Sequence, residues 1–220
     1  MKKVKFIQKL HNSTKRNYID RMIDNKVYCM NISQKFGKQY WDGDRKFGYG
    51  GYKYIKDRWK ELAVDLIKAF KLNKKSRILD IGCGKGFLMY EIHKLIKSNE
   101  IYGLEISNYA IKNSHPEIKN KIKQYDARNK LKYSNKEFDL AISIGCYHNF
   151  HLKDLDFAIN EFSRVSKNQY FVTEGYRNNR ELFNLQCWAL TCKSFYSNED
   201  WKYLLKKNNF KGMYEIIYFN

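Results

Sequence analysis

The sequence predicts an α/β protein with a Rossmann-like, doubly wound and mostly parallel seven-stranded sheet that carries helices on both faces. Two observations predict this fold. Short apolar runs of strand length alternate with helical patterns from residue 57 onward, which is typical of parallel strands joined by right-handed crossovers. A glycine-rich turn, Gly82–Gly86, follows the first apolar run. In such a sheet, ligands bind beyond the carboxyl ends of the strands, where the strand order reverses.

Residues 1–56 carry no long periodic pattern, and we expect them to form a helical and loop lid over the substrate site. Ser13 is a favourable N-cap residue, so a short helix is predicted from Ser13 to about Asp24. The segment from Tyr40 to Tyr52 is dense in aromatic residues and glycines, which indicates a loop. Residues 57–220 are expected to form one compact Rossmann-like unit.

The elements of that unit follow one another in a regular order. Apolar residues recur at helical spacing from Trp59 to Phe70, and the buried run Ile78–Ile81 reads as the first strand. Leu88, Ile92 and Ile96 mark the helix after the glycine turn. Further strands are predicted at 101–105, 122–125, 138–144, 170–173 and 214–219, and further helices at 107–111, 155–165 and around 201–205.

The composition is that of an ordered globular protein with a strongly basic surface. The chain has 220 residues, of which 43% are hydrophobic, and a formal net charge of +19. Lysine is spread along the whole chain, so a solvated lysine-rich surface is one interpretation of this charge. The other is a footprint for a polyanion such as nucleic acid, or a field that attracts a smaller anionic substrate.

The cysteines and the chain start bear on location. The five cysteines form no CxxC pair and are odd in number, so neither a disulfide framework nor a zinc site is expected. The basic start lacks the apolar stretch of a signal peptide, and no segment approaches the roughly 20 apolar residues of a membrane helix. We therefore expect a cytoplasmic protein with no membrane span.

The glycine turn carries an acidic residue that distinguishes between cofactors. Asp80 precedes Gly82-x-Gly84-x-Gly86, whereas the dinucleotide pattern requires its third glycine at position 87, where Phe87 stands. A carboxylate at this strand end suits a ligand with an ammonium group and a sulfonium, and it disfavours a pyrophosphate. The turn therefore favours a cationic cofactor.

Acidic residues also end the next two strands. Glu105 follows Gly82 by 105 − 82 = 23 residues, close to the roughly 20 expected for a carboxylate that accepts from both ribose hydroxyls. Two neighbouring donors are best met by two charged acceptor oxygens in one plane. Asp126 ends the third strand, where its carboxylate is placed to accept from an adenine amino group.

From about Arg77 to Thr173 the chain resembles the class I S-adenosylmethionine-dependent methyltransferases. The resemblance rests on Ile78–Gly86, Tyr102–Ser107, Asp126, Phe138–Ile144 and Glu161–Lys167. It implies S-adenosylmethionine as cofactor, with Asp80 and the glycines lining the methionine part, Glu105 on the ribose, and Asp126 with Ala127 beside an adenine that packs on Ile106. Ile144 and Gly145 would offer backbone groups. The candidate cofactor-binding residues are Asp80, Gly82, Cys83, Gly84, Gly86, Phe87, Glu105, Ile106, Asp126, Ala127, Ile144 and Gly145.

The flanking segments resemble a bacterial subgroup of these enzymes that is often associated with surface polysaccharide gene clusters. The segments are Trp41–Arg45, Phe47–Tyr52, Tyr147–Asn149 and Glu174–Asn178. The end of the chain departs from the subgroup, because Gly212-Met213-Tyr214-Glu215 stands where Gly-Asp-Tyr-Glu is expected. A role for Glu215 at the site is therefore left open.

Methyl transfer to a hydroxyl needs alignment and a base. His148, Glu174 and Tyr147 are the catalytic candidates, since they follow the fourth and fifth strands and histidine is a common general base. A structural histidine, and a Glu174 that pairs with a cation such as Arg177, remain the alternatives. The candidate substrate residues, some of them in the lid, are Arg45, Tyr49, Tyr52, Asn149, Tyr176 and Arg177.

Other methylation chemistries fit less well. The segment Gly145–Asn149 lacks the Asn/Asp-Pro-Pro-aromatic turn of enzymes that methylate nucleic-acid amines, and Cys146 lacks the setting of a cytosine nucleophile. A metal site from His148, His151 and Asp154 or Asp156 is not expected. The basic surface and the resemblance to the bacterial subgroup favour O-methylation of a small, anionic acceptor: a sugar, a nucleotide-sugar or a phosphorylated precursor of a surface glycan. RNA methylation using the basic surface is the alternative, and a non-catalytic binding module is the third hypothesis.

Overall fold

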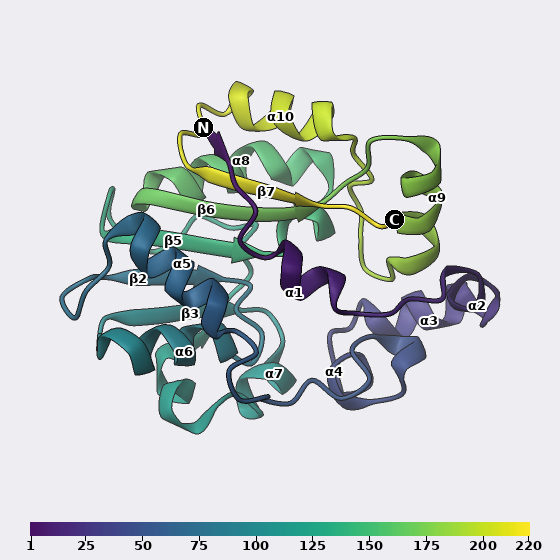
Figure 1. Ribbon diagram of the computed structural model, residues 1–220, viewed down its shortest axis with the longest axis horizontal. Helices are drawn as coiled ribbons and strands as arrows, with labels where there is room; N and C mark the ends of the chain where they lie inside the picture. Colours follow the sequence, from purple (N-terminus) through teal and green to yellow (C-terminus); the bar gives the residue numbers. More distant parts are fainter.

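The computed structural model describes residues 1–220 and contains one seven-stranded, fully parallel sheet (Figure 1). The strand order is β1-β7-β6-β5-β2-β3-β4, so the order reverses between β2 and β5. The predicted fold class is therefore confirmed. The strands are β1 (Lys2–Lys3), β2 (Ile78–Ile81), β3 (Ile101–Glu105), β4 (Ile122–Gln124), β5 (Phe138–Ile144), β6 (Ser166–Glu174) and β7 (Met213–Ile217).

Helices cover both faces of the sheet. Helices α5 and α6 pack on one face, and α8 and α10 pack on the other. The helices are α1 (Gln8–Asn12), α2 (Tyr18–Ile23), α3 (Lys26–Ser33), α4 (Lys38–Asp42), α5 (Lys60–Phe70), α6 (Phe87–Ile96), α7 (Asn108–Lys112), α8 (Leu152–Arg164), α9 (Asn179–Trp188) and α10 (Asn198–Lys207). Three short 3-10 helices span Arg45–Phe47, Pro116–Lys121 and Tyr147–Asn149. None of the helices combines the length and apolar character that crossing a membrane requires.

The apolar strands divide their side chains between two cores. In β2, Leu79 and Ile81 enter the core beneath α8 and α10, while Ile78 enters the core beneath α5 and α6. In β6, Phe171 and Val172 likewise enter opposite cores. Strands that are buried on both faces read as continuous hydrophobic runs, which is why the sequence identifies them without an alternating pattern.

The first residues of the chain belong to the sheet. Lys2 and Lys3 pair with β7 and supply the seventh strand, and Val4 and Ile7 are buried in the core beneath α5 and α6. The buried carboxylate of Glu215 accepts from the backbone N–H groups of Phe6 (2.8 Å) and Ile7 (3.1 Å), so it tethers this segment to β7. The predicted division of the chain at residue 56, between a lid and a Rossmann-like unit, stays a prediction. The first residues of the predicted lid segment also belong to the sheet and its core.

Three local expectations are corrected. Ser13 ends α1 and begins no helix, because Asn17 is the residue whose side chain accepts from Asp20 N and so caps α2. The segment 40–52, expected to be a loop, contains the end of α4 and a 3-10 helix. The sequence patterns gave no sign of α9.

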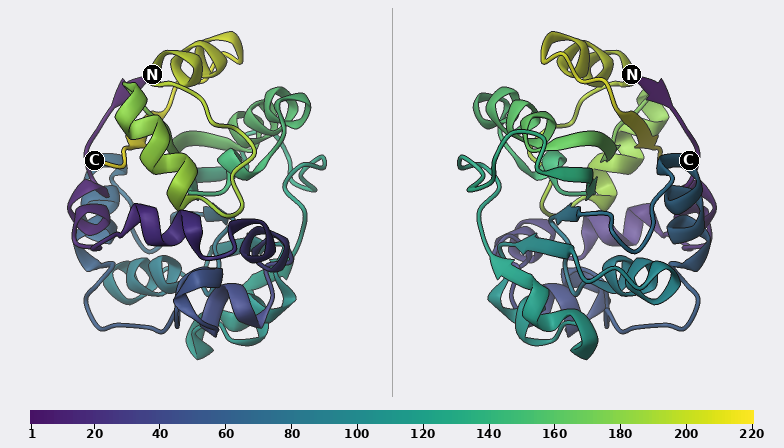
Figure 2. Two further views of the ribbon diagram at one scale, coloured as in Figure 1. Left: turned by 90° about the vertical axis from the view of Figure 1, so that its right-hand side faces the viewer. Right: turned by 90° about the vertical axis from the view of Figure 1, so that its left-hand side faces the viewer.

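The N-terminal helices and α9 lie beyond the carboxyl ends of the strands (Figure 1). Seen from that end, they stand in front of the sheet (Figure 2, left). Helix α2 packs on α9, with the rings of Tyr18 and Trp188 edge to face at 6.2 Å. The helices thus cover the edge at which a doubly wound sheet binds its ligands.

Candidate functional site

The glycine turn after β2 has a conformation and a tightness that require glycine. Gly82, Gly84 and Gly86 have φ angles of 76°, 57° and 72°, in the left-handed region. A Cβ atom at Gly82 would lie 2.6 Å from Cys146 Cβ, and one at Gly84 would lie 2.9 Å from the Trp41 ring. The turn therefore brings the backbone close to whatever lies beyond β2 and to the indole that covers it.

Glu105, at the end of β3, holds this turn. Its Oε2 accepts from Gly84 N (2.8 Å), and its Oε1 accepts from Ser107 N (2.8 Å). Ser107 in turn caps α7 through Ala110 N. Each carboxylate oxygen accepts one bond in this way and keeps acceptor capacity for a ligand. Burial raises the pKa of Glu105 despite the hydrogen bonds from Ser107 and Gly84.

Asp80, at the end of β2, lies beside Glu105 and is not neutralised. Its side chain is buried, with 4% of the residue exposed. Burial and the nearby charge of Glu105 raise the pKa of Asp80 to about 7, and no hydrogen bond or cation counteracts them. Two neighbouring buried carboxylates without a counter-ion are costly, so this corner fits a cationic ligand and repels a diphosphate.

Asp126, just after β4, is paired within the chain. Arg128 Nε lies 2.9 and 3.1 Å from the two carboxylate oxygens, and Arg128 Nη2 lies 2.6 Å from one of them. The hydrogen bonds from Arg128 hold the pKa of Asp126 below its ordinary value. An adenine amino group at this carboxylate would share it with Arg128.

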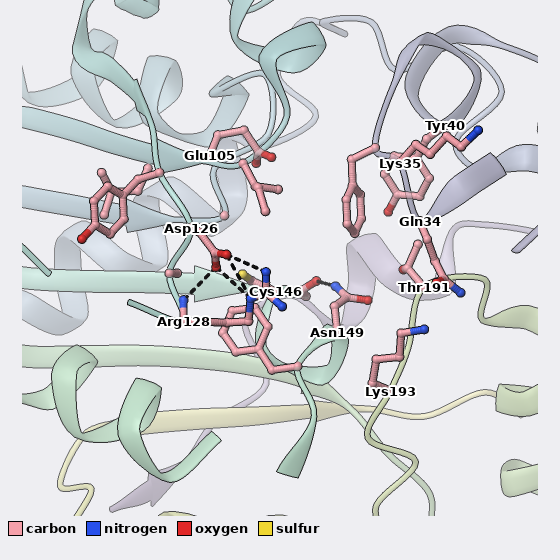
Figure 3. Close-up of a pocket in the computed structure, with 18 of the residues that line it drawn as sticks. Gln34, Lys35, Tyr40, Glu105, Asp126, Arg128, Cys146, Asn149, Thr191 and Lys193 are labelled. Carbon is pink, nitrogen blue, oxygen red and sulfur yellow. Dashed lines mark hydrogen bonds and ion pairs between the residues drawn. The ribbon is translucent and has the colours of Figure 1, made fainter. Parts of the chain in front are cut away.

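A cavity of about 350 Å³ lies beyond these strand ends (Figure 3). In Figure 3, Glu105 and Asp126 stand on one side, and Gln34, Lys35 and Tyr40 of the N-terminal segment stand on the other. Seven of the predicted cofactor residues line it: Gly82, Glu105, Ile106, Asp126, Ala127, Ile144 and Gly145. The predicted substrate residues Tyr49 and Asn149 line it too. The end of β5 and the lid therefore meet at this cavity.

The other five predicted cofactor residues lie in or beside the turn without lining this cavity. The Phe87 ring stacks on Tyr52 at 5.1 Å between centroids, and a Cβ at Gly86 would meet Ile118, so both positions serve packing. Gly84 faces Trp41 and Cys83 faces Gly103, while Asp80 is buried within β2. Their part in cofactor binding stays a prediction.

The lid is anchored directly to the turn. Lys85, inside the turn, places its Nζ 2.7 Å from both carboxylate oxygens of Asp42, which also accepts from the Tyr109 hydroxyl (2.8 Å). Trp41 stacks on Tyr49, with ring centroids 5.2 Å apart and 10° between planes, and its Nε1 donates to Ser107 Oγ (2.9 Å). Residues 41–52 therefore cover the turn as a closed lid.

His148 and Glu174 form a pair behind the cavity wall. His148 Nε2 lies 3.6 Å from Glu174 Oε2, and His148 is 5% exposed with its Nδ1 buried and without a partner. Neither residue lines the cavity itself. Gly145 lines the cavity and lies close to this pair, since a Cβ there would be 3.6 Å from His148 Cε1. The two catalytic candidates are thus brought together beside a residue of the cavity wall.

Three predicted residues lie away from this cavity. Tyr147 is buried in the core beneath α8, where its hydroxyl donates to Ala158 O (3.3 Å). Arg177 donates to Glu181 through Nε (2.9 and 3.0 Å) and stacks over Tyr218, and Tyr176 packs against a small cluster around Leu185 and Phe219. None of the three lines the cavity, and their roles at the site stay predictions.

Sequence reasoning missed much of the wall. The missed residues come from the end of α3 through α4, from β3 and the Asp126 turn, from the segment between β5 and α8 and from the loop after α9: Gln34, Lys35, Phe36, Tyr40, Trp41, Leu104, Tyr125, Arg128, Cys146, Phe150, His151, Thr191 and Lys193. Only Trp41 and Leu104 had a signal, since both lie in motifs that carry a resemblance. No cluster of three or more metal-ligating side chains occurs, and His148 pairs with Glu174 while His151 lies at the start of α8.

The remaining substrate candidates lie at a second cavity. Arg45 and Tyr52 line this cavity of about 530 Å³, together with Tyr49. The two cavities share Tyr40, Tyr49 and Thr191 among their lining residues, so they lie next to each other.

Comparison with known proteins agrees with the fold. The protein YcgJ of Bacillus subtilis is 18% identical over 66% of this chain and 66% of its own, with a TM-score of 0.50. A SAM-dependent methyltransferase from Archaeoglobus fulgidus is 20% identical over 68% of each chain, with a TM-score of 0.53. Phosphoethanolamine N-methyltransferase 2 of Haemonchus contortus is 16% identical over 89% of this chain and 45% of its own, with a TM-score of 0.51.

These likenesses establish the shared fold, and the chain spans about two thirds of the length of the first two proteins and less than half of the third. No curated protein sequence matches the chain. The family described as a methyltransferase domain matches residues 72–216, which include the glycine turn and all three strand-end carboxylates. Because this match spans well over half of the sequence, the chain belongs to the methyltransferase domain family.

Proposed function

We propose that the chain transfers the methyl group of S-adenosylmethionine to a hydroxyl of a small anionic acceptor. The acceptor class is a sugar, a nucleotide-sugar or a phosphorylated precursor of a surface glycan. One observation carries the proposal: Asp80 and Glu105 form a buried pair of carboxylates at adjacent strand ends, with no cation of the chain beside them. When bound, the cofactor supplies an activated methyl group on a sulfonium.

The residues that would hold the cofactor follow from the positions of the acidic groups. Asp80 would face the cationic methionine part, and the acceptor capacity left on Glu105 would take the ribose hydroxyls. Asp126 and Ile106 would flank the adenine in the cavity of about 350 Å³. The lid residues Trp41 and Tyr49 would exclude water from this site.

The His148–Glu174 pair supports a hydroxyl acceptor, because such an acceptor must lose a proton during transfer. Glu174 would accept from one ring nitrogen of His148 and so fix which nitrogen carries the proton. The remaining task of the chain is to align acceptor and methyl group, and orientation contributes about 7–11 kcal/mol in favourable cases.

The charge of the acceptor is supported by the chain and by one structural neighbour. A net charge of +19 attracts anions to the surface. The Haemonchus enzyme is described with phosphomonomethylethanolamine, a small phosphorylated molecule. All five cysteines are free, which suits a reducing compartment, and we propose the cytoplasm.

The test is a methyl-transfer assay with purified protein, S-adenosylmethionine and a panel of sugar phosphates, nucleotide-sugars and neutral sugars. We expect S-adenosylhomocysteine to accumulate only with a phosphorylated member, whose methylated product is identified by mass spectrometry. Calorimetry that detects no binding of S-adenosylmethionine at micromolar concentration would contradict the proposal and favour a non-catalytic module.

RNA is the second candidate acceptor, and only the net charge favours it. An RNA enzyme makes many phosphate contacts, so its affinity for transfer or ribosomal RNA falls steeply as salt rises. Gel-shift titrations across a salt series distinguish the two. A steep salt slope together with methylated RNA would replace the small-molecule proposal.

A further inference from the structure

The second cavity is lined by cationic and apolar residues and by no acidic one. It has a volume of about 530 Å³ and lies between the N-terminal segment, the lid and the end of α9. No aspartate or glutamate is among its lining residues. Burial and the charge of Arg16 lower the pKa of His11 to about 4, so this lining residue is neutral. The cationic side chains come from separate parts of the N-terminal region and converge on the cavity: Arg16, Arg21, Arg45, Lys53 and Arg58.

The arginines of this cavity are positioned without carboxylate partners. Arg16, Arg21 and Arg45 stack around the ring of Trp188, with guanidinium carbons 5.5, 4.7 and 5.0 Å from the ring centroid. Their hydrogen bonds go to backbone carbonyls, as from Arg16 Nη1 to Thr14 O (3.0 Å) and from Arg21 Nε to Trp188 O (3.4 Å). One further bond joins Arg16 Nη2 to the His11 ring at Nδ1 (3.1 Å). The aromatic ring therefore gathers three positive charges that form no ion pair, although the charges of Glu174 and Asp24 act on Arg16 and Arg21.

Two further observations indicate a missing anion. The Nε atom of Arg16 is buried and has no hydrogen-bond partner, although buried donors are nearly always paired. Burial and the repulsion from Arg45 lower the pKa of Arg21 to about 10. An anion in the cavity would satisfy the donor and offset the crowded charges.

From this arrangement we infer that the second cavity binds the phosphate or diphosphate group of the methyl acceptor. The inference rests on the proposed function, and it deepens it by naming the site that holds the anionic end. Tyr40, Tyr49 and Thr191 belong to both cavities, so an acceptor anchored among the arginines extends toward the cofactor cavity. A cavity of this size suits a small molecule and excludes a nucleic-acid duplex.

The experiment is calorimetric titration of the full-length protein with inorganic pyrophosphate, with S-adenosylhomocysteine titrated separately. We expect pyrophosphate to bind, also when S-adenosylhomocysteine is saturating. Arg16→Gln and Arg58→Gln are each expected to weaken pyrophosphate about tenfold, since each removes a charge-assisted contact. The Arg58 side chain makes no hydrogen bond or ion pair in the chain and is exposed, so its variant tests the site without disturbing the fold.

Arg180→Gln is the matched control, because Arg180 is exposed on α9 and lines neither cavity. It makes the same charge change, and we expect pyrophosphate affinity to stay within about twofold, since its charge is screened at a distance. Pyrophosphate that fails to bind, or that binds all variants equally, overturns the inference. So does transfer RNA that binds where pyrophosphate does not. Failure of S-adenosylhomocysteine to bind would instead count against the proposed function, and the pyrophosphate result would still report on this cavity.

Discussion

The Nζ atom of Lys85 lies 2.7 Å from both carboxylate oxygens of Asp42 and thereby joins the lid to the glycine turn. The Lys85 side chain is only 4% exposed, and its remaining bond goes to Tyr52 O (2.7 Å), also in the lid. All the hydrogen-bond partners of this ammonium group are therefore lid atoms. The Lys85 ammonium group can be bound either by lid atoms or by water. If the lid opens, water replaces Asp42.

We predict that Asp42→Asn opens the lid while leaving the rest of the fold intact. Removing one partner of a buried ion pair costs about 3–5 kcal/mol when the other charge stays buried. Opening the lid avoids this cost, because Lys85 then meets water. Hydrogen exchange followed by mass spectrometry should show amides of residues 38–52 exchanging about tenfold faster or more, since local opening governs their protection.

Asp44→Asn is the control for this lid prediction. Asp44 lies in the same segment but is exposed, and its side chain accepts only from Lys46 N (3.0 Å). Its variant should keep wild-type exchange across the lid. Equal exchange in the Asp42 and Asp44 variants would mean that the aromatic stacking of Trp41 and Tyr49 holds the lid without the ion pair.

We predict that Glu105→Gln loses cofactor affinity. A glutamine side chain has one oxygen, whereas Glu105 accepts from Gly84 N and Ser107 N with different oxygens. The amide NH₂ group would face one of these N–H donors, so the turn or α7 must shift, and the ribose loses a charged acceptor. Loss of a charge-assisted bond of about 1.5–3 kcal/mol corresponds to an S-adenosylhomocysteine dissociation constant about ten- to a hundredfold higher by calorimetry. An unchanged constant would remove Glu105 from the ribose site.

The fold was predictable because its signal is local. Strands buried on both faces are continuous apolar runs, and the predicted strands at 101–105 and 138–144 match β3 and β5. The N-terminal part was not predictable in this way. Asn17 caps α2 in place of Ser13, and two lysines form the edge strand β1, so the local sequence carries neither apolar periodicity nor strand propensity there.

The site was predictable only where the fold positions residues by rule. Glu105 and Asp126 end adjacent parallel strands, so topology alone brings them to one edge. Thr191 and Lys193 reach the cavity through a loop whose path depends on the packing of α9, which has no sequence signature. Tyr147 and His148 are neighbours in one 3-10 turn, yet one enters the core and the other pairs with Glu174. That difference is decided by tertiary contacts.

We predict that Asp80→Asn stabilises the protein at high pH. The pKa of Asp80 is raised to about 7 in the fold, above its ordinary value of 3.8. The folded state therefore binds a proton that the unfolded state has already lost, and stability falls as pH rises from about 4 to about 7. Asparagine removes this loss. Urea unfolding should show that the gain from Asp80→Asn is larger at pH 8 than at pH 4 by on the order of 2–4 kcal/mol.

The exposed-site variant Asp44→Asn makes the same carboxylate-to-amide change and serves as the control. Its effect on the free energy of unfolding should be small at both pH values. If Asp80→Asn also has the same effect at pH 4 and pH 8, Asp80 ionises as it does in the unfolded chain, and the strained carboxylate pair does not exist.

The same group predicts how cofactor affinity depends on pH. A sulfonium and an ammonium group bind ionised Asp80 better than its protonated form, so affinity should increase as pH rises through about 7. The dissociation constant of S-adenosylmethionine at pH 8 should be several-fold lower than at pH 6. In Asp80→Asn the constant should be higher and should change little between these pH values. A parallel pH dependence in both proteins would assign the effect to another group.

The last prediction contrasts two neighbours, His148 and Tyr147. His148→Ala should lower turnover about tenfold or more, because a hydroxyl acceptor then lacks its base. The dissociation constant of S-adenosylhomocysteine should stay within about threefold, because His148 is not among the proposed cofactor-binding residues. Tyr147→Phe should leave turnover unchanged. It should cost about 0.5–1.5 kcal/mol of unfolding free energy, because its hydroxyl donates to Ala158 O inside the core.

Steady-state kinetics with the acceptor found in the panel, urea unfolding and calorimetry separate the two effects. Glu174→Gln belongs to the same series, because it keeps the shape of the side chain but removes the charge that faces His148 Nε2 at 3.6 Å. If the pair acts together, His148→Ala and the double variant have the same turnover, since the carboxylate works only through the ring. Normal turnover in His148→Ala would reduce the pair to a structural contact, and the proton would then leave by another route.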